Sequence, residues 1–303
     1  MTLPTLLPPL AALGLCISLL CAALTSHAAP KVQRDVKFAS VGETPLLLDL
    51  YLPAAPARGL IVWVHGGAWR AGSRSSVDLA AMTARGWAVA SVDYRLSPVA
   101  KFPAQVHDIK AAIRYLRAHA AGLGFPASPI VVAGSSAGGH LAALVGVSNG
   151  HEQLEGKVGA ELATSSDVQG IVSLYGASNL TSILAQSTPH GLSVRVPALD
   201  LLLGAQPDKA PELARLASPV FHVGSSDPPL YMLHGDQDNQ MPINQSHELE
   251  AAYAEQRLTV RFEVVHGSGH GGPAFSTDAR LDAIDAFLRE HVAAKPGAGT
   301  AKR

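Results

Sequence analysis

The chain has 303 residues, of which 48% are hydrophobic, and its formal net charge is −1 at pH 7. This composition provides enough apolar side chains for one large core, and an α/β chain of this length is commonly a single domain. The near-neutral charge and the absence of a long basic run argue against a polyanion-binding protein, so nucleic acid is not expected as a partner.

The first 29 residues differ from the rest and are expected to be a signal peptide. The apolar stretch 10–24 has the length of a signal-peptide core, and Ser26-His-Ala28-Ala29 offers a small-residue cleavage site. An uncleaved anchor is the alternative, although this stretch is short for a membrane span. Both cysteines, Cys16 and Cys21, would leave with the signal. We therefore expect a periplasmic or secreted protein without disulfides and without stable membrane insertion.

The hydrophobic pattern predicts eight strands and five helices between residue 30 and residue 292. Strands are expected near 36–40, 46–52, 59–65, 88–93, 129–133, 170–174, 230–233 and 258–265. Helices are expected near 77–85, 103–119, 140–147, 245–256 and 277–291. After the first two strands, helices alternate with strands, which is typical of an α/β fold. We predict a mostly parallel sheet of about eight strands with an antiparallel start and helices on both faces, followed by a flexible tail at 293–303.

The longest irregular interval lies between the strands that end near residue 174 and begin near residue 230. It contains the apolar run 196–203 and the helical pattern 211–216. We expect a small helical cap over about 177–219 that shapes the acyl or alcohol pocket. The alternative is a surface excursion packed on the sheet.

The candidate nucleophile is Ser136. An apolar strand runs into Gly134-Ser-Ser136-Ala-Gly138, and a helical run follows. A serine between two glycines on a tight strand-to-helix turn projects its hydroxyl near the free N–H groups of the helix N-terminus. Ser135, its neighbour, does not occupy the apex of this turn.

Two later loops supply a candidate acid and a candidate base. Asp238 lies deep in the loop after strand 230–233, where its side chain can turn back toward a histidine, whereas Asp236 is expected to cap or brace the turn. His270 lies in the glycine-rich loop after strand 258–265, and His266 is expected to be a strand-end residue. The intervening Gly-Ser-Gly does not support a helical zinc pair, so no metal is expected.

Taken together, the motifs resemble a serine esterase of the α/β-hydrolase superfamily, in the branch of hormone-sensitive-lipase-like esterases and bacterial acetyl-xylan and feruloyl esterases. The similarity spans roughly residues 36–291. The segments that carry it are 65–69, 93–97, 102–103, 108, 111–117, 134–142, 217–220, 227–229, 234–242 and 267–271. The order Ser136, Asp238, His270 is also the order of that superfamily.

The resemblance implies an oxyanion hole and a structural acid. Main-chain N–H groups of Gly66, Gly67 and Ala68, with that of Ala137 behind the nucleophile, would receive the oxyanion. Asp108 would bond the elbow or the loop at Tyr94-Arg95.

The sequence departs from the pattern of the similar enzymes at two places. Ala68-Trp69 stand where lipase-like members usually have a third glycine and an aromatic residue. This departure resembles the His-Gly-Gly-x-Trp loop of kynurenine formamidases. Trp69 is expected either to line the substrate pocket or to be simple packing. Asn179 stands where similar enzymes often have an acid.

The sequence therefore predicts an exported carboxylesterase-type serine hydrolase that needs no cofactor and acts through an acyl-enzyme. Its expected substrates are small or polysaccharide-linked esters of short acyl groups, with acetyl or feruloyl esters of plant polysaccharide as candidates. An arylformamidase-like amide hydrolase is the alternative enzyme. A hydrolase fold that has lost catalysis and only binds ligands is the alternative from another class.

Overall fold

The computed structural model describes Met1 and residues 31–292. Apart from Met1, the predicted signal peptide lies outside the described residues, as does the predicted tail. Eight strands form one sheet in the order β1-β2-β4-β3-β5-β6-β7-β8. Their bounds are Lys31–Val41 (β1), Thr44–Leu52 (β2), Leu60–Val64 (β3), Ala88–Val92 (β4), Ile130–Ser135 (β5), Gly170–Leu174 (β6), Leu230–Gly235 (β7) and Val260–Val265 (β8).

The pairing directions confirm the predicted fold class. Strand β2 is antiparallel to β1 and to β4, and all other neighbouring strands are parallel. The parallel strands β3 and β5 are buried along their whole length, as expected for strands that are covered on both faces. This is the mostly parallel sheet with an antiparallel start that the sequence predicts.

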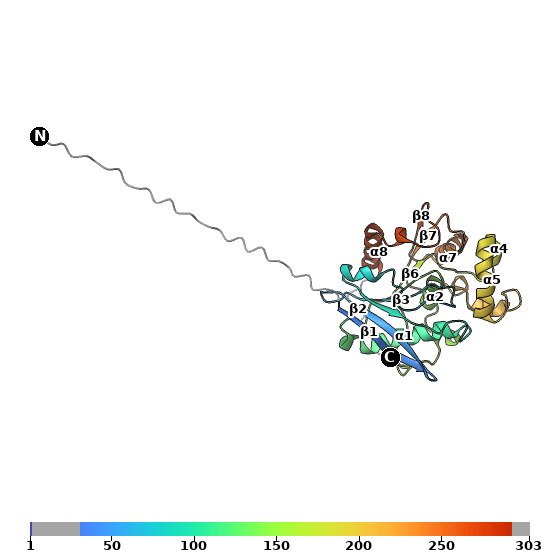
Figure 1. The fold of residues 1–303 in the computed structure, drawn as a ribbon, viewed down its shortest axis with the longest axis horizontal. Coiled ribbons are helices and arrows are strands. Elements are labelled where there is room, and N and C mark those ends of the chain that lie inside the picture. Colours follow the sequence, from blue (N-terminus) through green and yellow to red (C-terminus); the bar gives the residue numbers. More distant parts are fainter. Residues whose placement is uncertain (2–30, 293–303) are drawn as a thin grey trace.

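Helices pack on both faces of the sheet. They are α1 (Ala104–Leu123), α2 (Ala137–Gly146), α3 (Glu152–Glu155), α4 (Ile183–Gln186), α5 (Pro189–Leu203), α6 (Pro211–Leu216), α7 (Asn244–Glu255) and α8 (Asp278–His291). Three short 3-10 helices complete the set: η1 (Ala80–Arg85), η2 (Pro219–Phe221) and η3 (Pro273–Phe275). Figure 1 shows α8 and α1 on opposite sides of the sheet.

The core has two parts, one on each face. Successive residues of β3 alternate between them: Val62 belongs to the cluster that includes residues of α1, α2 and α7, whereas Ile61 and Trp63 belong to the cluster that includes residues of η1 and α8. This alternation follows from the two-residue period of a strand. Within residues 31–292, no helix combines the length and the apolar character that a membrane span requires.

Three predicted elements differ from those observed. The expected helix 77–85 is a 3-10 helix, η1, that ends at Gly86 with φ 84°. Helix α2 begins at Ala137 rather than near residue 140, directly after the nucleophile turn. Strand β1 is 11 residues long because register shifts let it follow β2 beyond the predicted 36–40.

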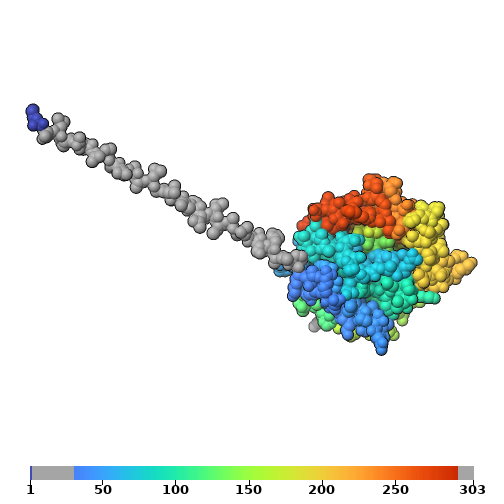
Figure 2. Space-filling model, viewed as in Figure 1, coloured from blue at the N-terminus to red at the C-terminus, as the bar shows by residue number. Residues whose placement is uncertain are grey.

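The interval between β6 and β7 contains the helices α4, α5 and α6 and the 3-10 helix η2. Helix α5 is the longest of them, and its ends are well defined. The side chain of Thr188 accepts a hydrogen bond from Gly191 at the N-terminus, Pro189 occupies the first turn, and Gly204 ends the helix in the left-handed region. Figure 1 shows α4 and α5 (yellow) at one end of the molecule, and Figure 2 shows the same segment bordering the C-terminal part of the chain.

The parallel register brings several loops to one edge of the sheet. Val64 at the end of β3 pairs with Gly134 of β5, and Gly235 at the end of β7 pairs with Val265 at the end of β8. The loops that follow β3, β5, β7 and β8 therefore start side by side. The candidate site residues lie in these loops, except Ala137, which is the first residue of α2.

Candidate active site

Ser136 occupies a strained turn between β5 and α2. Its backbone has φ 54° and ψ −119°, a conformation that residues with a side chain rarely adopt. A Cβ at Gly138 would lie 2.0 Å from the carbonyl oxygen of Val64, and one at Gly134 would lie 2.3 Å from that of Gly138. The two flanking glycines are therefore required for this turn, which holds the hydroxyl above the sheet edge.

Ser136, His270 and Asp238 form a continuous chain of hydrogen bonds. The Nε2 atom of His270 lies 2.8 Å from the Ser136 hydroxyl, and its Nδ1 atom lies 2.7 Å from Oδ2 of Asp238. Because an ionised carboxylate only accepts hydrogen bonds, Nδ1 carries the proton and Nε2 is free to accept one from Ser136. This geometry allows general-base activation of a serine nucleophile.

The Asp238 carboxylate is buried and surrounded by donors. Its Oδ1 accepts hydrogen bonds from the N–H groups of Gln240 and Met241 at 2.9 and 2.7 Å, and Nε2 of His234 lies 3.3 Å from Oδ2. Burial works to raise the pKa of Asp238, but the hydrogen bonds from His234, His270 and Met241 outweigh it and hold that pKa well below its usual range. The carboxyl is therefore ionised at neutral pH.

Asp236 has a different environment. Its carboxylate accepts hydrogen bonds from Nδ1 of His266 at 2.9 Å and from the N–H of Gly267 at 2.7 Å, and these contacts lower its pKa. Asp236 and His266 thus brace the turn after β8 and do not touch Ser136. Of the two acids and two histidines in these loops, only Asp238 and His270 are brought to the nucleophile.

The loop after β3 lies directly against the nucleophile turn. A Cβ at Gly66 would lie 3.4 Å from the Cβ of Ser136. Gly67 and Ala68 have positive φ angles of 111° and 51°. Within residues 31–292, the N–H groups of Gly66, Gly67, Ala68 and Ala137 donate to no other backbone oxygen. The four predicted donors are therefore free and lie in the loop and the helix end that flank Ser136.

Trp69 does not line the pocket, which corrects one of the two expectations for this residue. Its side chain is fully buried, and its indole Nε1 donates to Nδ1 of His140 at 3.0 Å. The reason is that a buried indole N–H needs an acceptor, and the imidazole of α2 supplies one. His140 in turn donates from Nε2 to the carbonyl oxygen of Ala217 at 2.7 Å, and burial lowers its pKa to about 4. Trp69 and His140 thus join the loop after β3 to the segment after α6.

A cavity of about 540 Å³ opens in front of Ser136. Its lining consists mostly of glycine, alanine and polar residues: Gly66, Gly67, Ala68, Arg70, Ala71, Gly72, Ser76, Asp78, Ser135, Ser136, Tyr175, Gln240, His270, Gly271 and Gly272. None of the residues 177–219, all of which are described, belongs to this lining. The interval between β6 and β7 therefore does not shape this pocket, contrary to the expectation of a pocket-forming cap.

Tyr175 is a site residue that the sequence analysis missed. It follows β6 with a positive φ of 41°, and its ring packs edge-on against His270 with centroids 4.8 Å apart. Burial, together with the charge of Asp78, raises the pKa of Tyr175 to about 12, so its hydroxyl stays protonated in the pocket. The one signal in the sequence was its place at the end of a predicted strand.

The other two residues singled out in the sequence have structural contacts. Asp108 accepts hydrogen bonds from the N–H, Nε and Nη2 of Arg95 at 2.8–2.9 Å, which is the loop contact implied by the resemblance. Asn179 donates to Oε2 of Glu248 at 2.6 Å. Similar enzymes often have an acid at the position of Asn179. In this structure the nearby carboxylate is that of Glu248 on α7, and the amide of Asn179 donates to it.

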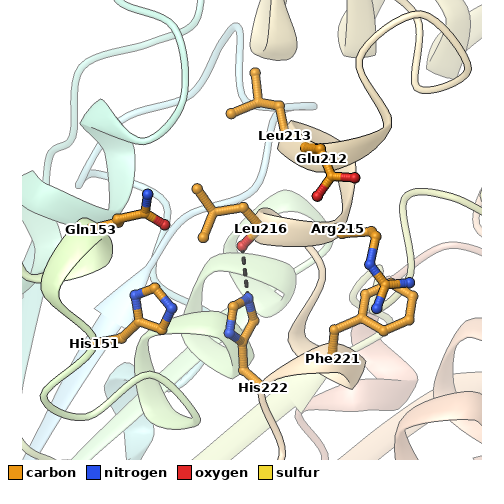
Figure 3. A pocket seen from close by; sticks show the side chains of 8 residues that line it. All are labelled: His151, Gln153, Glu212, Leu213, Arg215, Leu216, Phe221 and His222. Carbon is orange, nitrogen blue, oxygen red and sulfur yellow. Dashed lines mark hydrogen bonds between the residues drawn. The ribbon is translucent and has the colours of Figure 1, made fainter.

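A second cavity of about 590 Å³ lies away from the first and shares none of its lining residues. Figure 3 shows that it is bounded by α6, η2 and the segment around α3. Arg215 stacks over the ring of Phe221 at 3.9 Å, and Nε2 of His222 donates to the carbonyl oxygen of Leu216 at 2.9 Å. In the part of the chain that the structure describes, no group of three or more His, Cys, Asp or Glu side chains is arranged to hold a metal ion.

Comparisons with known proteins place this site in a family context. The family model BD-FAE matches residues 48–253. Among curated proteins, esterase LipC of Mycobacterium tuberculosis is 35% identical over 76% of this chain and 58% of its own length. The probable carboxylic ester hydrolase LipM of the same organism is 27% identical over 78% of this chain and 57% of its own length. The chain thus spans little more than half the length of these relatives.

Solved structures match over a larger share of their length. A truncated carbohydrate esterase from gut microbiota aligns with a TM-score of 0.79 and 31% identity, over 88% of this chain and 97% of that one. A thermophilic esterase of Thermogutta terrifontis, solved with propionate bound, aligns with a TM-score of 0.69 and 26% identity, over 89% and 98% of the two chains.

Proposed function

This chain belongs to the BD-FAE family, and on that premise we propose that it is a carboxylic-ester hydrolase that acts through Ser136, His270 and Asp238. The observation that carries the proposal is the unbroken hydrogen-bond chain from the Ser136 hydroxyl through His270 to Asp238, on a nucleophile turn flanked by free N–H groups. A protein that only binds ligands has no need of this arrangement.

The geometry supports a two-step acyl transfer. Nε2 of His270 takes the proton of the Ser136 hydroxyl as its oxygen attacks the ester carbonyl. The N–H groups of Gly67, Ala68 and Ala137 would stabilise the resulting oxyanion, and Asp238 stabilises the imidazolium. His270 then returns the proton to the departing alcohol, which leaves an acyl-enzyme on Ser136. Water, activated by the same imidazole, releases the acid.

The lining of the pocket supports the proposal of short acyl groups on a polar alcohol. Its walls are glycine and alanine backbone with the polar side chains of Arg70, Ser76, Asp78 and Gln240, so a long alkyl chain would gain little apolar contact there. We therefore propose acetyl or other short-chain esters of polysaccharide as substrates. Feruloyl esters lose the support expected from Trp69, because its ring is buried elsewhere.

Export is a further part of the proposal and rests on the sequence of residues 1–29 alone. The apolar stretch 10–24 and the small residues before Pro30 support cleavage and release to the periplasm or the medium. Cell fractionation and N-terminal sequencing of the recovered protein test it. A protein that keeps residues 1–29 and stays with the membrane would refute it.

Hydrolysis of p-nitrophenyl acetate by the purified protein tests the function, with Ser136→Ala as the decisive variant. Its kcat should fall by about 10⁴ to 10⁶ while the fold stays intact, because the three residues act as a unit. Ser135→Ala is the matched control and should retain activity. Acetylated xylan, a feruloyl ester and an N-formyl arylamide, assayed in parallel, distinguish the ester substrates from the amide alternative. A folded wild-type protein inactive on all four would favour the non-catalytic alternative.

A further inference from the structure

The helix α5 contacts the loop that carries Asp238. The Thr188 hydroxyl, which also caps α5, donates to the carbonyl oxygen of Asn239 at 2.5 Å. About two turns along the helix, Nη2 of Arg195 donates to the carbonyl oxygen of Gln240 at 2.5 Å. Both acceptors lie within two residues of Asp238, so α5 contacts the backbone of this loop directly after the acid.

Arg195 is a buried cation with little local compensation. Its relative exposure is 1%, and its Nε atom is buried without a hydrogen-bond partner among the described residues. Within residues 31–292, no carboxylate lies within ion-pair distance of its guanidinium. Burial lowers the pKa of Arg195 to about 10, while the charge of Asp238 favours its protonated form. The guanidinium is therefore charged at neutral pH, and the negative charge of Asp238 stabilises its charged form.

We propose that Arg195 is a positioning residue for Asp238: its hydrogen bond fixes the loop at Gln240, and its buried charge stabilises the carboxylate. The loop geometry matters because the N–H groups of Gln240 and Met241 meet Oδ1 of Asp238 only when this backbone is held in place. The interval between β6 and β7 then supports the loop that carries the catalytic acid, through the hydrogen bonds of α5 to its backbone. The inference rests on the proposed function, since it assigns a role toward the proposed triad.

The charge of Arg195 also bears on the pH dependence of the reaction. The charged and titratable groups around the Asp238–His270 pair are Arg195 from α5, His234 from β7 and Tyr175 from the end of β6, with Arg70 and Asp78 in the cavity that His270 lines. Removing a positive charge from this set makes it easier to add a proton to the hydrogen-bonded pair as a whole. The acidic limb of the kcat/KM profile, which reports protonation of the free enzyme's base, should therefore move to higher pH.

The test compares Arg195→Met, Arg195→Lys and Thr188→Val with wild type, on p-nitrophenyl acetate across the pH range. Arg215→Met is the matched control, because it removes one cation from the same interval but at the second cavity (Figure 3). In Arg195→Met, we expect the acidic midpoint to rise by about half a pH unit or more and kcat to fall about tenfold. KM should change little, because Arg195 does not line the pocket.

The two other variants separate the charge from the contact. Arg195→Lys keeps the cation, so its acidic midpoint should stay near the wild-type value even if kcat falls. Thr188→Val removes a loop contact without changing charge and should lower kcat at an unchanged midpoint. If Arg195→Met does not fold, these two variants still decide, because a shifted midpoint in either contradicts the charge role. A folded Arg195→Met with wild-type kcat and midpoint overturns the proposal, whereas an inactive wild type would instead overturn the proposed function.

Discussion

Replacing Asp238 by asparagine tests the proposed role of the acid most directly. The carboxylate accepts the Nδ1 proton of His270 at 2.7 Å, and Oδ1 accepts two main-chain N–H groups. In the variant, the carbonyl oxygen would keep the main-chain donors, and the new NH₂ group would face His270. An NH₂ group donates, so Nδ1 must become an acceptor and the imidazole proton moves to Nε2. His270 then presents a donor to Ser136 and cannot take its proton.

We expect Asp238→Asn to lower kcat on the order of 10⁴-fold, which corresponds to about 5.4 kcal/mol in activation free energy. The NH₂ group would also oppose Nε2 of His234, which already donates to the carbonyl oxygen of Met241. Loss of hydrogen bonds to a charged acceptor should therefore reduce the free energy of unfolding by about 1.5–3 kcal/mol. The folded-state pKa of Asp238 is lowered, so the stability that its carboxylate contributes to the wild-type protein is fully present above the ordinary pKa of aspartate. That stability is lost as the pH falls toward the lowered folded-state pKa.

The assay measures kcat for p-nitrophenyl acetate, with urea unfolding at neutral pH to obtain the stability change. Asp236→Asn is the control, since Asp236 braces His266 and Gly267 at the surface and should leave kcat nearly unchanged. Equal losses of kcat in the two variants, with both folded, would refute the assignment of Asp238 as the acid.

Three further outcomes are expected. Gly138→Ala should abolish activity or folding, because its Cβ would lie 2.0 Å from a carbonyl oxygen of β3. Activity assays and thermal melting measure the two effects, and a variant that is both active and stable would contradict the turn geometry. Glu155→Ala leaves the buried cations Lys110 and Arg114 unpaired and should cost about 3 kcal/mol, or roughly 6–12 °C in Tm. Burial opposes ionisation of Glu155, but its hydrogen bonds outweigh burial and lower its pKa. The difference in Tm between wild type and Glu155→Ala should therefore be largest at neutral pH and decrease as the carboxylate is protonated in acid. Across a p-nitrophenyl ester series, kcat/KM should peak between acetyl and butyryl and fall beyond about six to eight acyl carbons. The reason is that each methylene gains about 0.8 kcal/mol only where it is buried. An optimum at ten carbons would contradict the preference for short acyl groups that we infer from the polar lining.

The positions of the strands and the mostly parallel character of the sheet could be predicted because each parallel strand is a short apolar run followed by a turn. The α/β fold and the resemblance to an α/β-hydrolase serine esterase are confirmed by the sheet order and by the family. The juxtaposition of Ser136, Asp238 and His270 was predictable for the same reason. Parallel strands deliver their following loops to one edge, so residues more than 130 positions apart in the chain are placed together by topology alone.

Side-chain direction was harder to predict than position. Trp69 follows a glycine-rich loop at the pocket, yet its positive φ of 60° accompanies an indole that is buried against His140 and does not line the pocket. No periodicity signals such a reversal, because left-handed backbone at a non-glycine residue depends on tertiary contacts. The 3-10 helix η1 has the same explanation in part: its apolar residues follow a helical pattern, but the segment ends at Gly86 before a full α-helix forms.

The residues that hold the site in position were the hardest to predict from the sequence, and the reason is chemical. Arg195, His140 and His234 each donate to a main-chain carbonyl oxygen, at Gln240, Ala217 and Met241 respectively. Every residue carries such an oxygen, so the acceptor has no sequence signature, and only the donor could be noticed. A donor in the interval between β6 and β7 reads as an ordinary polar residue of a loop-rich segment until its burial is known. For this reason, the groups that react could be located by motif, whereas the groups that hold them in position required the coordinates of the whole fold.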